Sequence, residues 1–309
     1  MDCVRVPETC RRVVDLTCQT RMNPEAFYHR IIDCLLPEYG VVLEESAQIA
    51  RGTCLFGLGT RGMFYETLGI LPPAFGAKVQ TSLLQAAPPC GNTDTAMSAM
   101  FGQRYLVRNL LRNTTSLEIL KRNANLILND VGNAFAKTDE NNTADFVVLV
   151  VARTGSRSFN TESLLRLLLA LESISESAVI LFKGDESIRT SMEIFTRADA
   201  VVMYHGAAAA NLLFCKHLTL VVEITTYTDT VSKKSWRKNT DQIALIRPDL
   251  KVKVFRIPLH QVVSIDIINE KEDARDKDQY MKDARDIQLL KSDAEGIKEI
   301  ILNLRFQSY

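Results

Sequence analysis

Residues 198–224 read ADAVVMYHGAAAANLLFCKHLTLVVEI, and the rest of the second half of the chain can be ordered around them. An apolar β run at 200–204 leads through a His-Gly pair into a helix of small residues at 207–214, and a second β run follows at 220–224. A helix that opens at Gly206 leaves its first backbone N–H groups unpaired and aimed beyond the carboxyl end of the preceding strand. These residues therefore predict half of a parallel α/β unit, with an anion site at the start of its helix.

The second half of the chain alternates β runs with helical patterns. Runs rich in apolar and β-branched residues stand at 146–151, 178–182, 200–204, 220–224 and 252–257. Helical patterns at 161–172 and 186–197 have Asn160 and Asp185 as candidate caps, and an amphipathic helix at 287–304 is expected to dock back on the core. Such alternation predicts an α/β fold with a Rossmann-like parallel sheet, helices on both faces and a ligand crevice at the strands' carboxyl ends.

Polar residues follow these strands where each is expected to end. The first strand is followed by RTGSRSFN at 153–160, and Glu223 is placed at the end of the fourth. Arg153 and Arg157 suit a diphosphate, because guanidinium groups match phosphate oxygens and keep their charge at any physiological pH. Glu223 is the acceptor expected for ribose hydroxyls. The alternative for Glu223 is an ordinary carboxylate at the end of a strand, and the alternative for the two arginines is surface charge on a turn.

The motif His-Gly-Ala-x-x-x-Asn-x-x-Phe at 205–214, followed by a Val-Glu strand, resembles the nucleotide-binding segment of glycosyltransferase family 61. Members of this family include the EGF-domain-specific O-GlcNAc transferase and plant xylosyltransferases. Ala208 and Ala210 stand where the family usually has Gly and Thr, and 153–160 is similar to its Arg-x-x-x-Arg-x-x-x-Asn motif. The resemblance implies a nucleotide-sugar site formed by Arg153, Arg157, Asn160, His205, Gly206, Ala207, Asn211 and Glu223.

The N-terminal region carries the candidate catalytic residues. Asn23-Pro24 predicts the start of a helix that Pro37 ends, and His29 and Asp33, four residues apart, share one face of it. An ordinary polar face is the alternative. The segment resembles the family's opening motif in its acceptor-side domain, and a Gly- and Arg-containing loop before Phe64-Tyr65 resembles another of its segments.

The stretch between these motifs is short for the family, which suggests an abbreviated acceptor-side region. We expect residues 1–140 to form this N-terminal region and residues 141–309 to form the nucleotide-sugar-binding domain, with a polar boundary at 137–144. The family resemblance implies a GT-B-like architecture for the two regions.

The resemblance implies transfer of a sugar, GlcNAc or xylose, from a UDP-sugar to a hydroxyl of a protein or glycan. The resemblance also implies inversion at the anomeric carbon. The one Asp-x-Asp triplet, at Asp276 and Asp278, lies in a charged stretch, so we expect a metal-independent reaction with no cofactor besides the donor. His29 or Asp33 would be the base, and His205 could instead contact the donor. A catalytically inactive nucleotide-binding or scaffolding relative is the alternative, and a hydrolase lacks support because no Gly-x-Ser-x-Gly elbow occurs.

Composition narrows the partners and the compartment. Lys+Arg 37 and Asp+Glu 37 balance, which gives no reason to expect nucleic acid, and no uncharged run is long enough for a signal peptide or a membrane span. The family nevertheless implies the lumen of the Golgi or the endoplasmic reticulum. The seven cysteines are scattered, which argues against a structural zinc site and permits disulfides in such a lumen. Cys215 is interpreted as a packed thiol. Asn113 and Asn141 each begin an Asn-x-Thr sequon for N-glycosylation.

Overall fold

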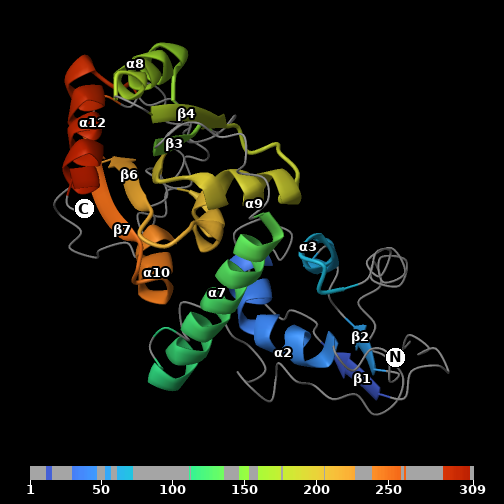
Figure 1. The fold of residues 1–309 in the computed structure, drawn as a ribbon. Helices are drawn as coiled ribbons and strands as arrows, with labels where there is room; N and C mark the ends of the chain where they lie inside the picture. The colour runs from blue at the N-terminus through green and yellow to red at the C-terminus, as the bar shows by residue number, and fades with distance from the viewer. Residues whose placement is uncertain are drawn as a thin grey trace, which may run out of the picture. The chain divides into compact units, whose positions relative to one another are not determined.

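The chain forms two compact units in this computed structural model, Met1–Ala136 and Lys137–Tyr309 (Figure 1). The structure describes residues 12–15, 30–46, 53–56, 61–71, 111, 113–135, 146–152, 159–174, 177–204, 206–226, 239–258, 261 and 288–306. Along these residues no helix is both long and apolar enough to cross a bilayer.

The second unit is built on a five-stranded sheet with the order β4-β3-β5-β6-β7. Its strands are β3 (Phe146–Val151), β4 (Ser177–Phe182), β5 (Ala200–Tyr204), β6 (Leu220–Thr226) and β7 (Lys251–Ile257). All neighbouring strands are parallel. The sequence places the strands correctly, because runs of Val, Leu and Ile this dense suit strands that are buried on both faces.

Helices cover both faces of this sheet. The helices are α8 (Thr161–Glu172), α9 (Ile188–Arg197), the 3-10 helix η5 (Ala207–Phe214), α10 (Asn239–Ile246) and α12 (Lys291–Phe306). On one face α8 and α12 lie side by side and bury Leu167 and Ile297 against Val148 and Val202 (Figure 1). The alternate residues of the strands point to the opposite face of the sheet, which α9 covers. There Phe195 of α9 packs edge-on against Phe182 of β4, at 5.1 Å between ring centroids. The predicted α/β fold of Rossmann type, like a GT-B nucleotide-binding lobe, is confirmed.

One helix cap differs from the expectation. The helix at 186–197 begins at Ile188, and its cap is Ser187, whose hydroxyl oxygen accepts from the backbone N–H of Thr190 at 3.1 Å. The carboxylate of Glu186 instead accepts from the N–H groups of Lys183 and Gly184. Asp185 was the wrong choice because Glu186 closes the turn before the helix, which moves the helix start two residues along.

The described part of the first unit contains one pair of parallel strands and three helical segments. The strands are β1 (Arg12–Asp15) and β2 (Thr53–Phe56). The helical segments are the π-helix η1 (Arg30–Leu35), which continues as α2 (Leu36–Ser46), then α3 (Gly62–Thr67) and α7 (Thr114–Phe135). No pattern in the sequence predicts β1, because a four-residue strand is too short for a clear alternation.

Pro37 does not end its helix, contrary to the prediction. It is the second residue of α2. Because proline has no N–H, one regular helical hydrogen bond is missing there, and the turn before it is a π-helix, the wider form of helix. The side-chain amide of Asn123 on α7 donates to the carbonyls of Leu36 and Pro37 at 3.0 and 3.1 Å. Gly40 permits this approach, since a Cβ there would lie 2.8 Å from Asn123 Oδ1. Packing against α7 therefore stabilises a helix that the proline alone would interrupt.

Candidate nucleotide-sugar site

The candidate site lies at the carboxyl edge of the sheet between β3 and β5. These strands are neighbours, with Val151 paired to Met203, but the chain leaves β3 for β4 on one side and returns to β5 on the other. Parallel sheets bind ligands at such a reversal of strand order, because the two connections depart in opposite directions and leave a crevice. The two motifs singled out in the sequence follow directly after these two strands.

A ring contact brings the two motifs together. Phe159, near the end of the first motif, lies 6.5 Å from Tyr204, the residue before the second motif, measured between ring centroids. Both side chains are buried, and the separation is within the usual range for aromatic pairs. Arg153, Arg157 and His205 themselves lie outside the described residues, so their contacts with a ligand stay predictions.

Asn160 caps α8, as expected. Its Oδ1 accepts from the backbone N–H of Ser163 at 2.7 Å, and the helix runs over Thr161–Glu172 as predicted. Asn160 is the last residue of the first motif, so its cap joins the end of that motif to the start of α8. A contact between Asn160 and a nucleotide is not tested by this geometry and stays a prediction.

The small residues after Gly206 form a 3-10 helix, η5, rather than an α-helix. Its first bond joins the N–H of Ala209 to the carbonyl of Gly206 at 3.2 Å. Ala208, Ala209 and Ala210 are buried and Ala207 is partly exposed, so their small side chains let η5 lie tightly against the protein.

Asn211, also on η5, carries an unsatisfied polar atom. The residue is 2% exposed, and its Oδ1 has no hydrogen-bond partner in the described structure. Buried acceptors are almost always paired, because leaving one unpaired costs on the order of 1–3 kcal/mol. An acceptor left in this state beside a predicted ligand site suits a hydroxyl or N–H group of the ligand.

Glu223 lies differently from the expectation. The strand β6 continues to Thr226, so Glu223 stands three residues before the strand end and is fully buried. The hydroxyl of Thr240, on α10, donates to its carboxylate. This bond ties α10 to the sheet, and the predicted role toward ribose hydroxyls stays a prediction.

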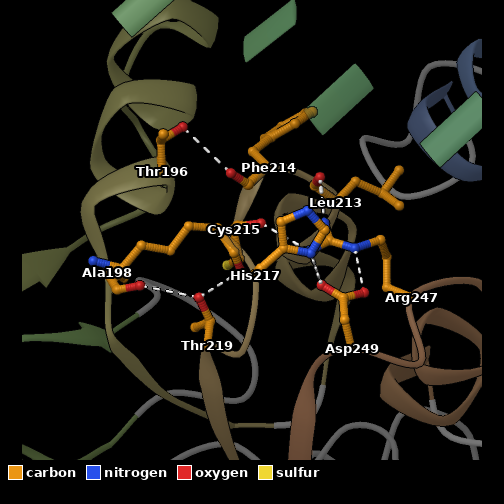
Figure 2. A network of polar contacts seen from close by, with 10 residues as sticks. Thr196, Ala198, Leu213, Phe214, Cys215, His217, Thr219, Arg247 and Asp249 are labelled. Atoms are coloured by element: carbon orange, nitrogen blue, oxygen red, sulfur yellow. Dashed lines mark hydrogen bonds and ion pairs between the residues drawn. The ribbon is translucent and has the colours of Figure 1, made fainter. Parts of the chain in front are cut away.

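The carboxyl end of η5 is held by a buried arginine (Figure 2). Arg247 is fully buried and donates from Nη1 to the carbonyl of Leu213 and from Nη2 to that of Cys215, each at 3.0 Å. It also forms a two-bond pair with Asp249, from Nε at 2.8 Å and from Nη2 at 2.6 Å. The sequence did not predict this clamp, because an arginine just past a short helix is usually exposed, and nothing local marks Arg247 as buried.

The pKa of Asp249 reflects this clamp. Partial burial acts to raise it, but the hydrogen bonds and the charge of Arg247 outweigh burial, and Nδ1 of the exposed His217 adds a contact at 3.0 Å. The net result is a pKa below the usual value. Burial raises the pKa of the neighbouring Cys215 thiol to about 12, against an opposing effect of Arg247, so this free cysteine is a packed thiol, as predicted.

The candidate catalytic residues belong to the first unit. Asp33 lies on η1 and is 4% exposed, while His29 lies outside the described residues. A buried polar cluster that the sequence did not reveal follows on α2, where Glu38 Oε1 accepts from Arg61 Nε at 2.8 Å and from the Tyr65 hydroxyl at 3.2 Å. Burial raises the pKa of Glu38, although the charge of Arg61 opposes it. Arg61 and Tyr65 come from the loop and aromatic pair already noted in the sequence.

Two further observations concern metals and redox state. Within the described ranges, no three or more His, Cys, Asp or Glu side chains gather in a way that could hold a metal ion. Cys34, on η1, is disulfide-bonded.

The parallel sheet and its reversal of strand order define an α/β lobe of the Rossmann type. The family model for glycosyltransferase 61 matches residues 27–222, which include parts of both units. The chain belongs to this family and is a glycosyltransferase. A search among curated proteins found no matching relative.

Proposed function

We propose that this glycosyltransferase is an inverting, metal-independent enzyme that transfers GlcNAc or xylose from a UDP-sugar to a hydroxyl of a protein or glycan in the secretory lumen. The observation that carries the donor site is the meeting of the two motifs at the reversal of strand order. Phe159, near the end of the first motif, contacts Tyr204, just before the second, and this contact supports a common site for the two motifs at that edge of the sheet.

The chemistry asks for stabilisation of the departing diphosphate. As the bond between the sugar and UDP breaks, negative charge grows on the phosphate oxygens. Arg153 and Arg157 would supply two fixed positive charges, and the first amide groups of η5 would donate hydrogen bonds. These groups can do the work that a divalent cation does in other transferases, which supports a metal-independent reaction.

Inversion needs one base for the acceptor hydroxyl. The hydroxyl attacks the anomeric carbon from the face opposite UDP and gives its proton to that base. His29 or Asp33 would take the proton, as the family motif implies. His205, Gly206, Ala207 and Asn211 would contact the donor, and the unpaired Oδ1 of Asn211 supports this assignment.

The donor site is tested by thermal unfolding with UDP in the presence of EDTA. UDP at about 100 times its Kd should stabilise the chain by about 2.7 kcal/mol. Arg157→Ala should abolish this gain, while Arg189→Ala, which removes an exposed arginine from α9, should keep it. An unchanged UDP effect in Arg157→Ala would remove the diphosphate assignment, and a gain that needs Mg²⁺ or Mn²⁺ would remove metal independence.

Turnover separates an active enzyme from an inactive relative. We expect release of UDP from UDP-GlcNAc or UDP-xylose, accelerated by an acceptor, with His29→Ala or Asp33→Asn inactive but still stabilised by UDP. UDP binding without any release from either donor would favour the inactive relative, for which the short front region and the alanines at 208 and 210 are the sequence arguments.

A further inference from the structure

The start of α7 presents an unassigned modification site. Asn113, Thr114 and Thr115 form an Asn-x-Thr sequon, and all three residues are exposed. The other sequon, at Asn141, lies outside the described residues. A sequon is a frequent triplet, so its surroundings decide whether it can carry a glycan.

Asn113 already caps α7 through one of its two amide atoms. Its Oδ1 accepts from the N–H of Ser116 at 3.0 Å, and its backbone carbonyl accepts from the N–H of Leu117 at 2.9 Å. An N-linked glycan is attached through the other atom, Nδ2, and leaves the amide oxygen an acceptor. The cap and the glycan are therefore compatible at the same residue.

The packing of α7 leaves room for a bulky group at this end. The first buried side chain of the helix is Leu120, and the buried stripe continues through Ala124, Ile127 and Val131 on the side that meets α2. The sequon lies before this stripe. A glycan there would not have to displace any of these core contacts.

The disulfide at Cys34 supplies an independent argument about compartment. Disulfides persist in oxidising environments such as the lumen of the endoplasmic reticulum, which is also where N-linked glycans are attached. Cys34 and Asn113 belong to the same unit. The disulfide is independent of the donor, the acceptor and the catalytic residues proposed above.

We propose that Asn113 is an N-glycosylation site. In the reaction, Nδ2 forms a bond to C1 of an oligosaccharide carried on a lipid diphosphate, and the bond between C1 and the diphosphate oxygen breaks. The lipid diphosphate leaves, and Nδ2 gives up one proton. The hydroxyl of Thr115 completes the sequon that the host enzyme recognises.

The experiment expresses the full chain behind a cleavable secretion leader in a eukaryotic cell line and measures intact mass before and after PNGase F, in cells and medium together. Thr115→Ala keeps the Asn113 cap but breaks the sequon, and should lose the mass of one glycan. Thr115→Ser keeps the sequon and should retain that mass. Asn113→Asp keeps a capping oxygen but lacks the nitrogen that accepts the glycan, so it should lose the mass of one glycan.

Two results would overturn the proposal. One is a wild-type chain without any PNGase F-sensitive mass. The other is an equal glycan mass in the wild-type chain and in Thr115→Ala, which would place the glycan elsewhere. Adding Thr143→Ala, which breaks the sequon at Asn141, should leave the glycan at Asn113 in place.

Discussion

Two buried asparagines, one in each unit, illustrate how stability and binding can oppose each other. Oδ1 is buried without a partner in both Asn211 on η5 and Asn123 on α7, but Nδ2 of Asn123 donates to two backbone carbonyls. The two residues are the same type at nearly the same exposure. Their substitution should therefore have opposite effects on folding.

Asn211→Leu should cost no stability and gain up to about 1 kcal/mol, because it removes an unpaired buried acceptor while keeping the number and branching of heavy atoms. The same variant should lose stabilisation by UDP. Asn123→Leu should cost about 1–3 kcal/mol, since it removes two hydrogen bonds and leaves their carbonyls with fewer partners. Urea unfolding with and without UDP measures both effects, and an Asn211→Leu variant that is less stable yet fully responsive to UDP would contradict the assignment.

Asp249 gives a prediction about pH. Its pKa in the folded chain lies below the usual value, so its ion pair with Arg247 contributes stability above the unfolded-state pKa of about 3.9 and loses it as the pH falls through the lower, folded-state pKa. The gap in unfolding free energy between the wild-type chain and Asp249→Asn should be constant from pH 7 to about 5 and should shrink below about 4. Urea unfolding at a series of pH values measures it. A gap that instead widens on acidification would show that the sign is wrong.

At the scale of elements, η5 is held at its carboxyl end by side chains from other elements. Arg247 binds the carbonyls of Leu213 and Cys215, and Thr196 of α9 donates to that of Phe214 (Figure 2). The last carbonyls of a helix have no partners within it, so these bonds satisfy them. The first amide groups of η5 are the ones assigned to the diphosphate.

Arg247→Met should therefore lower the unfolding free energy by about 3–5 kcal/mol, since it leaves buried carbonyls and Asp249 without their partner. His217→Ala is the matched control on the same carboxylate. His217 is 64% exposed, so this change should cost less than about 0.5 kcal/mol. Denaturant unfolding compares the two, and equal losses would show that the clamp does not hold η5.

The elements also show what the sequence could and could not predict. The strand at 146–151, the cap at Asn160 and the helix at 161–172 were predicted to the residue, because apolar runs and caps are local signals. The continuation of a helix through Pro37 and the burial of Glu223 were not, since they depend on Asn123 and Thr240, residues 86 and 17 positions away. Of the candidate site, the sequence indicated which segments take part, and it could not indicate which side chains the packing leaves unpaired.

At the scale of the whole molecule, the chain consists of two compact units. The second unit has its own sheet and a core that α12 completes by returning to α8, while the described part of the first unit is stabilised by α2 against α7. The residues assigned to the donor all belong to the second unit, and the candidate bases belong to the first. Folding, donor binding and transfer should accordingly be separable by dividing the chain.

Residues Lys137–Tyr309 expressed alone should fold and keep the gain in stability from UDP, because every group assigned to the diphosphate and the nucleoside lies within them. This fragment should not transfer sugar, since neither His29 nor Asp33 is present to accept the proton of the acceptor hydroxyl. Thermal unfolding with UDP and a UDP-release assay measure the two properties, and Arg157→Ala in the fragment is the control for specific binding. If the fragment folds but UDP stabilises only the full chain, the donor site requires residues of the first unit. In that case two guanidinium groups and the start of η5 are not enough to hold the diphosphate.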